Sequence, residues 1–199
     1  MKVSRNLTAI IAVVVIALVA VGARLAVWSG HSTDNASVPT IGGSFTLTDQ
    51  DGKTVSDTDF RGRYTLIFFG YTFCPDVCPT TLSTVAGALD KLPPAEAAKV
   101  VPIFISIDPE RDTAPVMHDY VRAFSPAIVG LTGSPDAIAK VAKAFKVYAA
   151  KVKGDAPDRY TMDHSAILYL MGPDGRFVAH FTHGVSAEDL AAGLRKHLG

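Results

Sequence analysis

Two continuous apolar runs set the strongest limit on how this chain can fold. They are YTLIFFGY at residues 64–71 and VVPIFISI at residues 100–107, and neither alternates with polar residues. Runs of this length and composition are typical of strands buried on both faces of a sheet. The segment between them shows helical spacing of apolar side chains over residues 79–92, at Leu82, Val85, Ala86 and Leu89. Two buried strands joined through a helix predict a right-handed parallel crossover.

The rest of the chain predicts further elements around this unit. Two turn sequences, Asp-Gly and Gly-Pro-Asp-Gly, each lie between short strand-like runs and indicate hairpins. The hairpins are expected at 44–56 and 165–181, and helices at 113–124, 134–145 (N-cap Ser134) and 186–198 (N-cap Ser186). Together the elements predict an α/β chain with a thioredoxin-like fold. Its central mixed sheet would be flanked by helices, with an N-terminal hairpin and the cysteines at the first strand-to-helix junction.

The N-terminus predicts a membrane anchor. Residues 7–23 carry no charge and no proline, and they follow Lys2 and Arg5. At about 1.5 Å per residue, a helix of this length nearly spans the ~30 Å hydrocarbon core of a bilayer. The basic residues place the N-terminal end in the cytoplasm and the rest of the chain outside it. We therefore expect a single transmembrane anchor at 1–28, a small polar tether at 29–38 and one globular domain at 39–199.

A cleaved signal peptide is the alternative interpretation of this segment. The apolar region of a signal peptide is normally shorter, and only a weak cleavage site lies near Gly22 and Ala23. The segment also lacks the Arg- and Ser-rich composition of a mitochondrial presequence. The expected setting is therefore the bacterial inner membrane, with the domain on the periplasmic side. Both interpretations place the domain where thiols tend to be oxidised.

The overall charge argues against a nucleic-acid ligand. The chain has 19 Lys and Arg residues against 19 Asp and Glu residues, so its formal net charge is zero. Without an excess of positive charge there is no electrostatic reason to bind phosphates. No nucleic-acid partner is therefore expected.

The only cysteines, Cys74 and Cys78, lie in GYTFCPDVCPTT, with three residues between them and a proline after each. Proline fits the first turn of a helix, so the pair is expected where the first buried strand gives way to the helix. A helix N-terminus favours the thiolate, which binds soft metals and also attacks disulfides. The position therefore activates the pair without choosing between a metal site and redox chemistry. A structural disulfide is a third interpretation, but such a short loop would remove little chain entropy.

His164 is the candidate third ligand of a metal site. It directly precedes a predicted strand, in TMDHSAILYL, and in a thioredoxin-like fold the loop before this strand lies against the cysteine turn. Two thiolates and one imidazole suit copper, because sulfur selects Cu(I) and imidazole accepts either oxidation state. Zinc would accept the same ligands with a water in the fourth place.

The sequence resembles the SCO/SenC family of copper chaperones over roughly residues 40–198. GYTFCPDVCPTTL is similar to the cysteine motif of the family, ISIDPERDT to its D-P-x-R-D-T segment, and YTMDHSAILYLMGPDGRFVAHF to its D-H-S strand and hairpin. This resemblance implies a thioredoxin-like domain that binds one copper ion, as Cu(I) or Cu(II). The implied ligands are Cys74, Cys78 and His164, and the two cysteines would form a disulfide when oxidised.

The same resemblance implies a metallochaperone and not a conventional enzyme. Its task would be to help assemble the binuclear copper site of cytochrome c oxidase. The implied partners are the oxidase subunit that contains this site, a protein that donates copper, and the membrane. Members of the family insert copper, reduce the disulfide of the target cysteines, or do both. The alternative function is a thiol–disulfide oxidoreductase, for which His164 would be dispensable.

Other polar residues near these motifs are weaker candidates. Asp163 can orient His164 or lie on the surface, and Asp76 can bond the backbone of the cysteine turn or face a partner. A polar group also follows the second buried strand, on the cysteine side of the sheet, where it can dock a partner or cap the next helix. This group consists of Asp108, Arg111 and Asp112.

Overall fold

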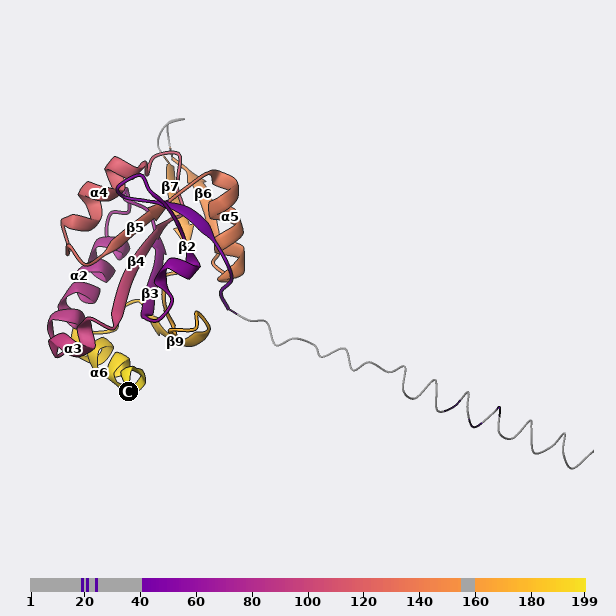
Figure 1. Ribbon diagram of the computed structural model, residues 1–199. Helices are drawn as coiled ribbons and strands as arrows, with labels where there is room; N and C mark the ends of the chain where they lie inside the picture. The colour runs from indigo at the N-terminus through magenta and orange to yellow at the C-terminus, as the bar shows by residue number, and fades with distance from the viewer. Residues whose placement is uncertain (1–18, 20, 22–23, 25–40, 155–159) are drawn as a thin grey trace, which may run out of the picture. The chain divides into compact units, whose positions relative to one another are not determined.

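The computed structural model describes residues 19, 21, 24, 41–154 and 160–199. All its strands lie in the compact unit from Ile41 to Gly199, shown in Figure 1. In chain order the elements are β1 (Thr46–Asp49), β2 (Thr54–Ser56), the 3-10 helix η1 (Asp57–Phe60), β3 (Tyr64–Gly70), α2 (Val77–Asp90), α3 (Pro94–Ala97), β4 (Val100–Ser106), α4 (Ala114–Arg122), β5 (Val129–Thr132), α5 (Pro135–Ala144), β6 (Ala149–Lys153), β7 (Tyr160–His164), β8 (Ile167–Met171), β9 (Phe177–Thr182) and α6 (Ala187–Leu198).

A mixed sheet of seven strands forms the centre of the domain, in the order β2-β1-β5-β4-β3-β8-β9. The two apolar runs become β3 and β4, which pair in parallel from Tyr64 opposite Val100 to Gly70 opposite Ser106. The predicted parallel crossover through α2 is therefore confirmed. The two predicted hairpins are also confirmed, as the antiparallel pairs β1–β2 and β8–β9.

Helices cover both faces of this sheet, and neighbouring residues of β3 show which helix covers which face. Phe68 stacks on Phe104 of β4, and the Phe104 ring lies 5.5 Å from that of Tyr120 on α4. Phe69 points the other way, to Phe145 at the end of α5, with ring centroids 5.3 Å apart. Figure 1 shows α2 and α4 on one side of the central strands and α5 on the other. The predicted thioredoxin-like α/β architecture is thus confirmed.

The structure differs from the sequence predictions at three places. Helix α2 begins at Val77, two residues before the expected start, so both Cys78 and Pro79 lie in its first turn. The short helix α3 was not predicted, because four residues carry too little periodicity. The third difference is a separate two-stranded sheet of β6 and β7, which we call the ribbon. Its strands are mostly exposed, so they lack the apolar pattern of a core strand.

The predicted anchor (1–28) and tether (29–38) lie almost wholly outside the described residues. Within this segment the structure describes Val19, Val21 and Arg24, which are helical. Among the helices that are described, none combines the length and the apolar character needed to cross a membrane.

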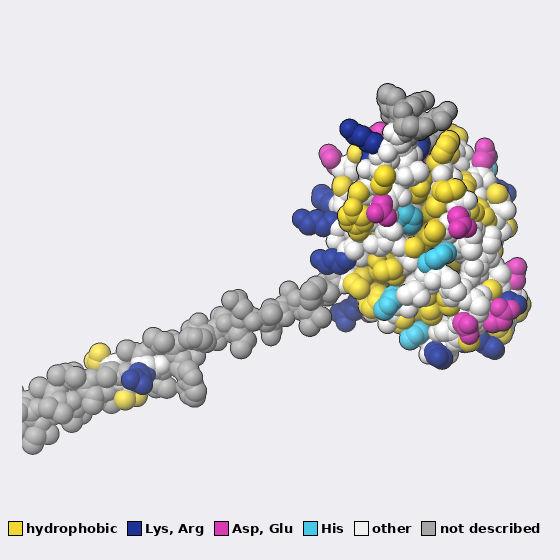
Figure 2. Space-filling view, turned by 180° about the vertical axis from the view of Figure 1, so that it is seen from behind, with side chains coloured by type: hydrophobic (Ala, Val, Ile, Leu, Met, Phe, Trp, Pro, Cys, Tyr) yellow, Lys and Arg dark blue, Asp and Glu magenta, His cyan; other side chains and the backbone are white. Residues whose placement is uncertain are grey.

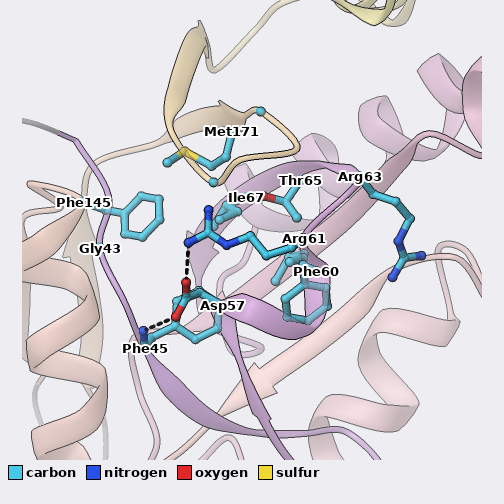
Figure 3. Close-up of a pocket in the computed structure, with 13 residues that line it drawn as sticks. Gly43, Phe45, Asp57, Phe60, Arg61, Arg63, Thr65, Ile67, Phe145 and Met171 are labelled. Atoms are coloured by element: carbon cyan, nitrogen blue, oxygen red, sulfur yellow. Dashed lines mark hydrogen bonds and ion pairs between the residues drawn. The ribbon is translucent and has the colours of Figure 1, made fainter.

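A small pocket lies between the segments that flank the N-terminal hairpin and strands β3 and β4 of the sheet (Figure 3). In it, Arg61 donates a hydrogen bond to Asp57 at 2.7 Å, and the same carboxylate accepts one from the Phe45 backbone at 3.3 Å. A Cβ at Gly175 would collide with the Arg61 guanidinium, and Gly175 also has a φ of +73°. The remaining cavity of about 30 Å³ has room for about one water molecule. This pocket therefore connects parts of the fold and does not offer a ligand site.

We expect Ser186→Ala to lower the free energy of unfolding by about 1 kcal/mol, because the side chain of Ser186 caps α6. Its Oγ accepts a hydrogen bond from the Asp189 backbone N–H at 3.0 Å. Thr113→Ala is the matched control, since Thr113 occupies the N-cap of α4 without a side-chain hydrogen bond. Urea unfolding followed by circular dichroism measures both changes. Equal losses in the two variants would contradict a capping role for Ser186.

Candidate metal centre

The cysteines lie where the sequence placed them, at the junction of β3 and α2. The Cys74 backbone N–H bonds the carbonyl of Tyr71 at 3.3 Å, which closes the turn after the strand. Cys78 is the second residue of α2 and is fully buried, whereas Cys74 is partly exposed. Both are free thiols in the structure. One thiol thus faces the surface and the other lies beneath it.

His164 completes the group, as the sequence predicted. It is the last residue of β7, and its Nε2 lies 3.7 Å from the Sγ of Cys78. The other ring nitrogen, Nδ1, lies 3.2 Å from the carbonyl oxygen of Ser165. When Nδ1 carries the proton and donates it to this carbonyl, Nε2 has a free lone pair that points toward the thiols. The two sulfurs and the imidazole nitrogen all lie within 4.8 Å of one another.

The two thiols have opposite electrostatic environments. A hydrogen bond from the Cys78 thiol is the largest cause that lowers the pKa of Cys74, to about 5. The backbone N–H of Cys78, 3.4 Å from the Cys74 sulfur, lowers this pKa further, while burial opposes both effects. The same thiol–thiol hydrogen bond, together with burial, raises the pKa of Cys78. Cys74 is therefore a thiolate at neutral pH. Cys78 keeps its proton until a metal ion or an electrophile binds its sulfur in place of that proton.

A buried carboxylate supports the loop that leads to Cys74. Asp112 has no exposed surface and accepts hydrogen bonds from the hydroxyls of Ser106 and Thr72, each at 2.6 Å. It also accepts one from the Thr72 backbone at 3.1 Å. Burial raises the pKa of Asp112. The idea that Asp112 caps the next helix is wrong, since Thr113 occupies the N-cap of α4.

The two acidic neighbours of the site have different surroundings. The carboxylate of Asp76 accepts a hydrogen bond from the Thr80 hydroxyl at 3.2 Å, and its backbone N–H helps to lower the pKa of Cys74. Asp163 lies on the exposed side of β7, beside the groove that contains Cys74 and His164. The Nδ1 atom of His164 lies within hydrogen-bond distance of the Ser165 carbonyl oxygen and not of the Asp163 carboxylate.

The surface around the site is largely apolar. A groove of about 430 Å³ contains Cys74 and His164 together with Val77, Val152 and Ala166. Figure 2 shows a face of the domain on which hydrophobic and histidine side chains lie close together, with Lys and Arg mainly toward its margins. A partner can therefore reach the exposed sulfur and the imidazole through apolar contacts.

Two sulfurs and one imidazole nitrogen in this arrangement form a three-ligand site with an open side. Thiolates select soft ions such as Cu(I), and imidazole accepts copper in either oxidation state. The same donors fit zinc with a water as the fourth ligand. The geometry alone thus supports a soft or borderline metal ion.

Comparison with known proteins gives the family. The sequence model of the SCO1/SenC family matches residues 33–199. The chain is 41% identical to the Arabidopsis thaliana "Protein SCO1 homolog 1, mitochondrial" over 174 residues. These residues make up 87% of this chain and 51% of that protein. The chain belongs to the SCO1/SenC family. This confirms the resemblance carried by the three motifs.

Two solved SCO structures resemble the domain closely. Bradyrhizobium japonicum ScoI with copper bound is 51% identical, with a TM-score of 0.73 over 79% of this chain and 99% of that chain. BsSco, described as having a disulfide switch and as a member of the Sco family of cytochrome c oxidase assembly proteins, is 27% identical. Its TM-score is 0.63 over 80% of this chain and 94% of that chain. The chain spans about half the length of the Arabidopsis and human SCO1 relatives, 51% and 54% respectively.

Sequence reasoning missed one group of residues beside the SCO site. Tyr160, at the start of β7, contacts both Asp108 and Arg111. The alternation of Tyr160, Met162 and His164 was the signal that could have found it, because these three share one face of a strand.

Proposed function

We propose that this SCO protein binds one copper ion through Cys74, Cys78 and His164 and acts as a metallochaperone, not as an enzyme. The recipient would be the binuclear copper site of cytochrome c oxidase. The observation that carries the proposal is the convergence of the three ligand atoms to within 4.8 Å at a strand-to-helix junction. The copper-bound ScoI structure, at 51% identity, supports copper over zinc.

The geometry suits an ion that must be both held and released. The Cys74 thiolate and the buried Cys78 sulfur provide the soft donors, and His164 adds a nitrogen from another element. The open side of the groove lets a ligand from the recipient bind the ion before Cys74, Cys78 and His164 dissociate from it. Transfer by stepwise ligand exchange therefore needs no free copper ion in solution.

Thiol–disulfide exchange is the second candidate function, and the low pKa of Cys74 favours it. The Cys74 thiolate would attack a target disulfide, forming a mixed disulfide and releasing one target thiolate. Cys78, after losing its proton to solvent, would attack the Cys74 sulfur and release the second target thiolate. The SCO pair would end as a disulfide and the target as a dithiol. The disulfide switch described for BsSco supports such a step.

The proposed setting is the bacterial inner membrane. Residues 1–28 would anchor the chain, 29–38 would tether it, and the domain from 39 onward would face the periplasm. The support for this is the uncharged run at 7–23 behind two basic residues. The partners would be the copper-site subunit of the oxidase and a copper donor. Asp76 and Asp163 are proposed to support the ligands from the rim of the site.

Copper stoichiometry tests the function. We expect the full chain in detergent, reduced and kept without oxygen, to bind one copper ion. Cys74→Ser/Cys78→Ser should abolish stoichiometric binding, and His164→Ala should weaken it. His183→Ala is the matched control, because that histidine lies against Thr81 and outside the three-ligand group. Weak binding in the wild type, with intact exchange on a disulfide substrate in His164→Ala, would favour the reductant instead.

A further inference from the structure

The ligand His164 lies on an element that the main sheet does not hold. Within the described residues, β6 and β7 pair only with each other. The backbone bond from Ser165 to Tyr148, at 3.1 Å, extends the ribbon but does not join it to the central strands. The position of His164 over the thiols therefore depends on its two-residue link to β8, on the packing of its ring against Phe68 and Tyr71, and on contacts between the ribbon and the body of the domain.

One face of β7 is turned toward the body of the domain. Tyr160, Met162 and His164 are partly buried, whereas Thr161 and Asp163 are exposed. Because side chains of a strand alternate, these three point the same way. Whatever fixes Tyr160 at one end of the strand also limits where His164 lies at the other.

Tyr160 is fixed by what we call the clasp, made of Asp108, Arg111 and Tyr160. The Tyr160 hydroxyl donates to Asp108 at 2.8 Å, and Arg111 donates from Nε to the other oxygen of the same carboxylate. Arg111 also donates from Nη1 to the Tyr160 carbonyl at 3.0 Å, and its Cζ lies 3.7 Å from the centroid of the Tyr160 ring. Asp108 is 1% exposed, so the carboxylate that accepts two of these charge-assisted bonds is shielded from water.

Arg111 reaches the cysteine side of the site as well. Its Cζ lies 4.9 Å from the centroid of the Phe73 ring, directly before Cys74 in the chain, and 5.8 Å from that of Tyr71. Among the described residues, its Nη2 is buried without a hydrogen-bond partner. Arg111 therefore contacts both ligand-bearing segments, the cysteine turn through Phe73 and the ribbon through Tyr160.

We infer that Arg111 is a positioning residue that holds the ribbon against the body of the domain, and that this places His164 over the two thiols and sets the affinity of the site for Cu(II). This inference rests on the proposed copper function. Tyr160 and Asp108 act through the same contacts.

The effect is specific to the oxidation state of copper. Both sulfurs belong to the segment that runs from the turn after β3 into the first turn of α2, and backbone hydrogen bonds within this segment hold them: Cys74 N–H to the Tyr71 carbonyl and Cys78 N–H to the Cys74 sulfur. Two thiolates satisfy Cu(I), which is soft and accepts low coordination, whereas Cu(II) gains more from the imidazole nitrogen. A loosened ribbon therefore weakens Cu(II) binding and leaves Cu(I) binding nearly unchanged.

The test uses the full chain in detergent and titrates Cu(I) and Cu(II) separately against competing chelators. Arg111→Met should lower the Cu(II) affinity by about 10- to 100-fold, the range found when partners of metal ligands are removed. Tyr160→Phe, which keeps the ring but loses the bond to Asp108, should lower it less. Cu(I) affinity should change by less than about threefold in both. Electron paramagnetic resonance of the Cu(II) form should show altered nitrogen coupling.

Arg195→Met is the matched control, because Arg195 also bonds a carboxylate through Nε, to Glu96 at 3.1 Å between α6 and α3. It should leave both affinities and the nitrogen coupling unchanged. Unchanged Cu(II) binding in Arg111→Met and Tyr160→Phe would overturn the inference, and so would parallel losses of Cu(I) and Cu(II). If Arg111→Met does not fold, Tyr160→Phe decides. A wild type that binds neither ion would instead reject the proposed copper function.

Discussion

At pH 6, iodoacetamide should alkylate Cys74 at least about a hundred times faster than Cys78. With a pKa of about 5, Cys74 is mostly thiolate at this pH, and the residue is partly exposed. Cys78 is fully buried, and its pKa is raised. Thiolates of low pKa are weaker nucleophiles, so Cys74 should exceed an ordinary cysteine only on the order of tenfold. Mass spectrometry of the labelled peptide measures both rates.

The pH dependence of this rate has a definite sign. A thiol whose pKa is lowered loses reactivity as pH falls through the lowered value, so the Cys74 rate should fall below pH 5 and level off above about pH 6. Cys78→Ala removes the hydrogen bond that lowers the pKa most, and should shift the profile upward in pH. Equal labelling of the two cysteines, or a Cys74 rate that climbs steadily from pH 6 to pH 9, would contradict the assignment.

The parts of the fold that the sequence predicted are those with strong local signals. The apolar runs of β3 and β4 are typical of strands buried on both faces, and their residues are in fact almost all buried. Ser134 and Ser186 each accept a hydrogen bond from the third residue on, as N-caps do. His164 was placed near the cysteines by the geometry of the fold class, not by its own neighbours in the sequence.

Beyond the alternation that puts Tyr160 on the same strand face as His164, the sequence carries no signal for the ribbon and the clasp, and the reason is physical. The clasp joins residues far apart in the chain: Arg111 and Tyr160 are 49 positions apart, and Asp108 and Tyr160 are 52 apart. Its charged groups carry no apolar periodicity, and in sequence they are equally compatible with a helix cap or a docking surface. Burial alone distinguishes these roles, and burial depends on the packing of the whole domain.

Gly70→Ala should be the most damaging single methyl addition near the site. Gly70 ends β3, and a Cβ there would lie 2.6 Å from the Cys78 sulfur and 2.7 Å from the Phe104 ring. Both neighbours are fully buried, so neither has free space into which to move. Overpacking of this kind costs about 1–3 kcal/mol, and we expect the upper end of that range. The displaced Cys78 sulfur should also weaken copper binding.

Gly87→Ala is the control for this change, and its expected sign is opposite. Gly87 lies within α2, and its nearest neighbour to an added Cβ would be Ala187 at 3.5 Å, an ordinary contact. Alanine favours the helix over glycine by up to about 1 kcal/mol, so this variant should gain stability and bind copper normally. Urea unfolding and copper titration measure both variants. Wild-type stability and copper affinity in Gly70→Ala would mean that the Cys78 sulfur can shift freely. The site would then not be fixed by the packing of β3 against α2.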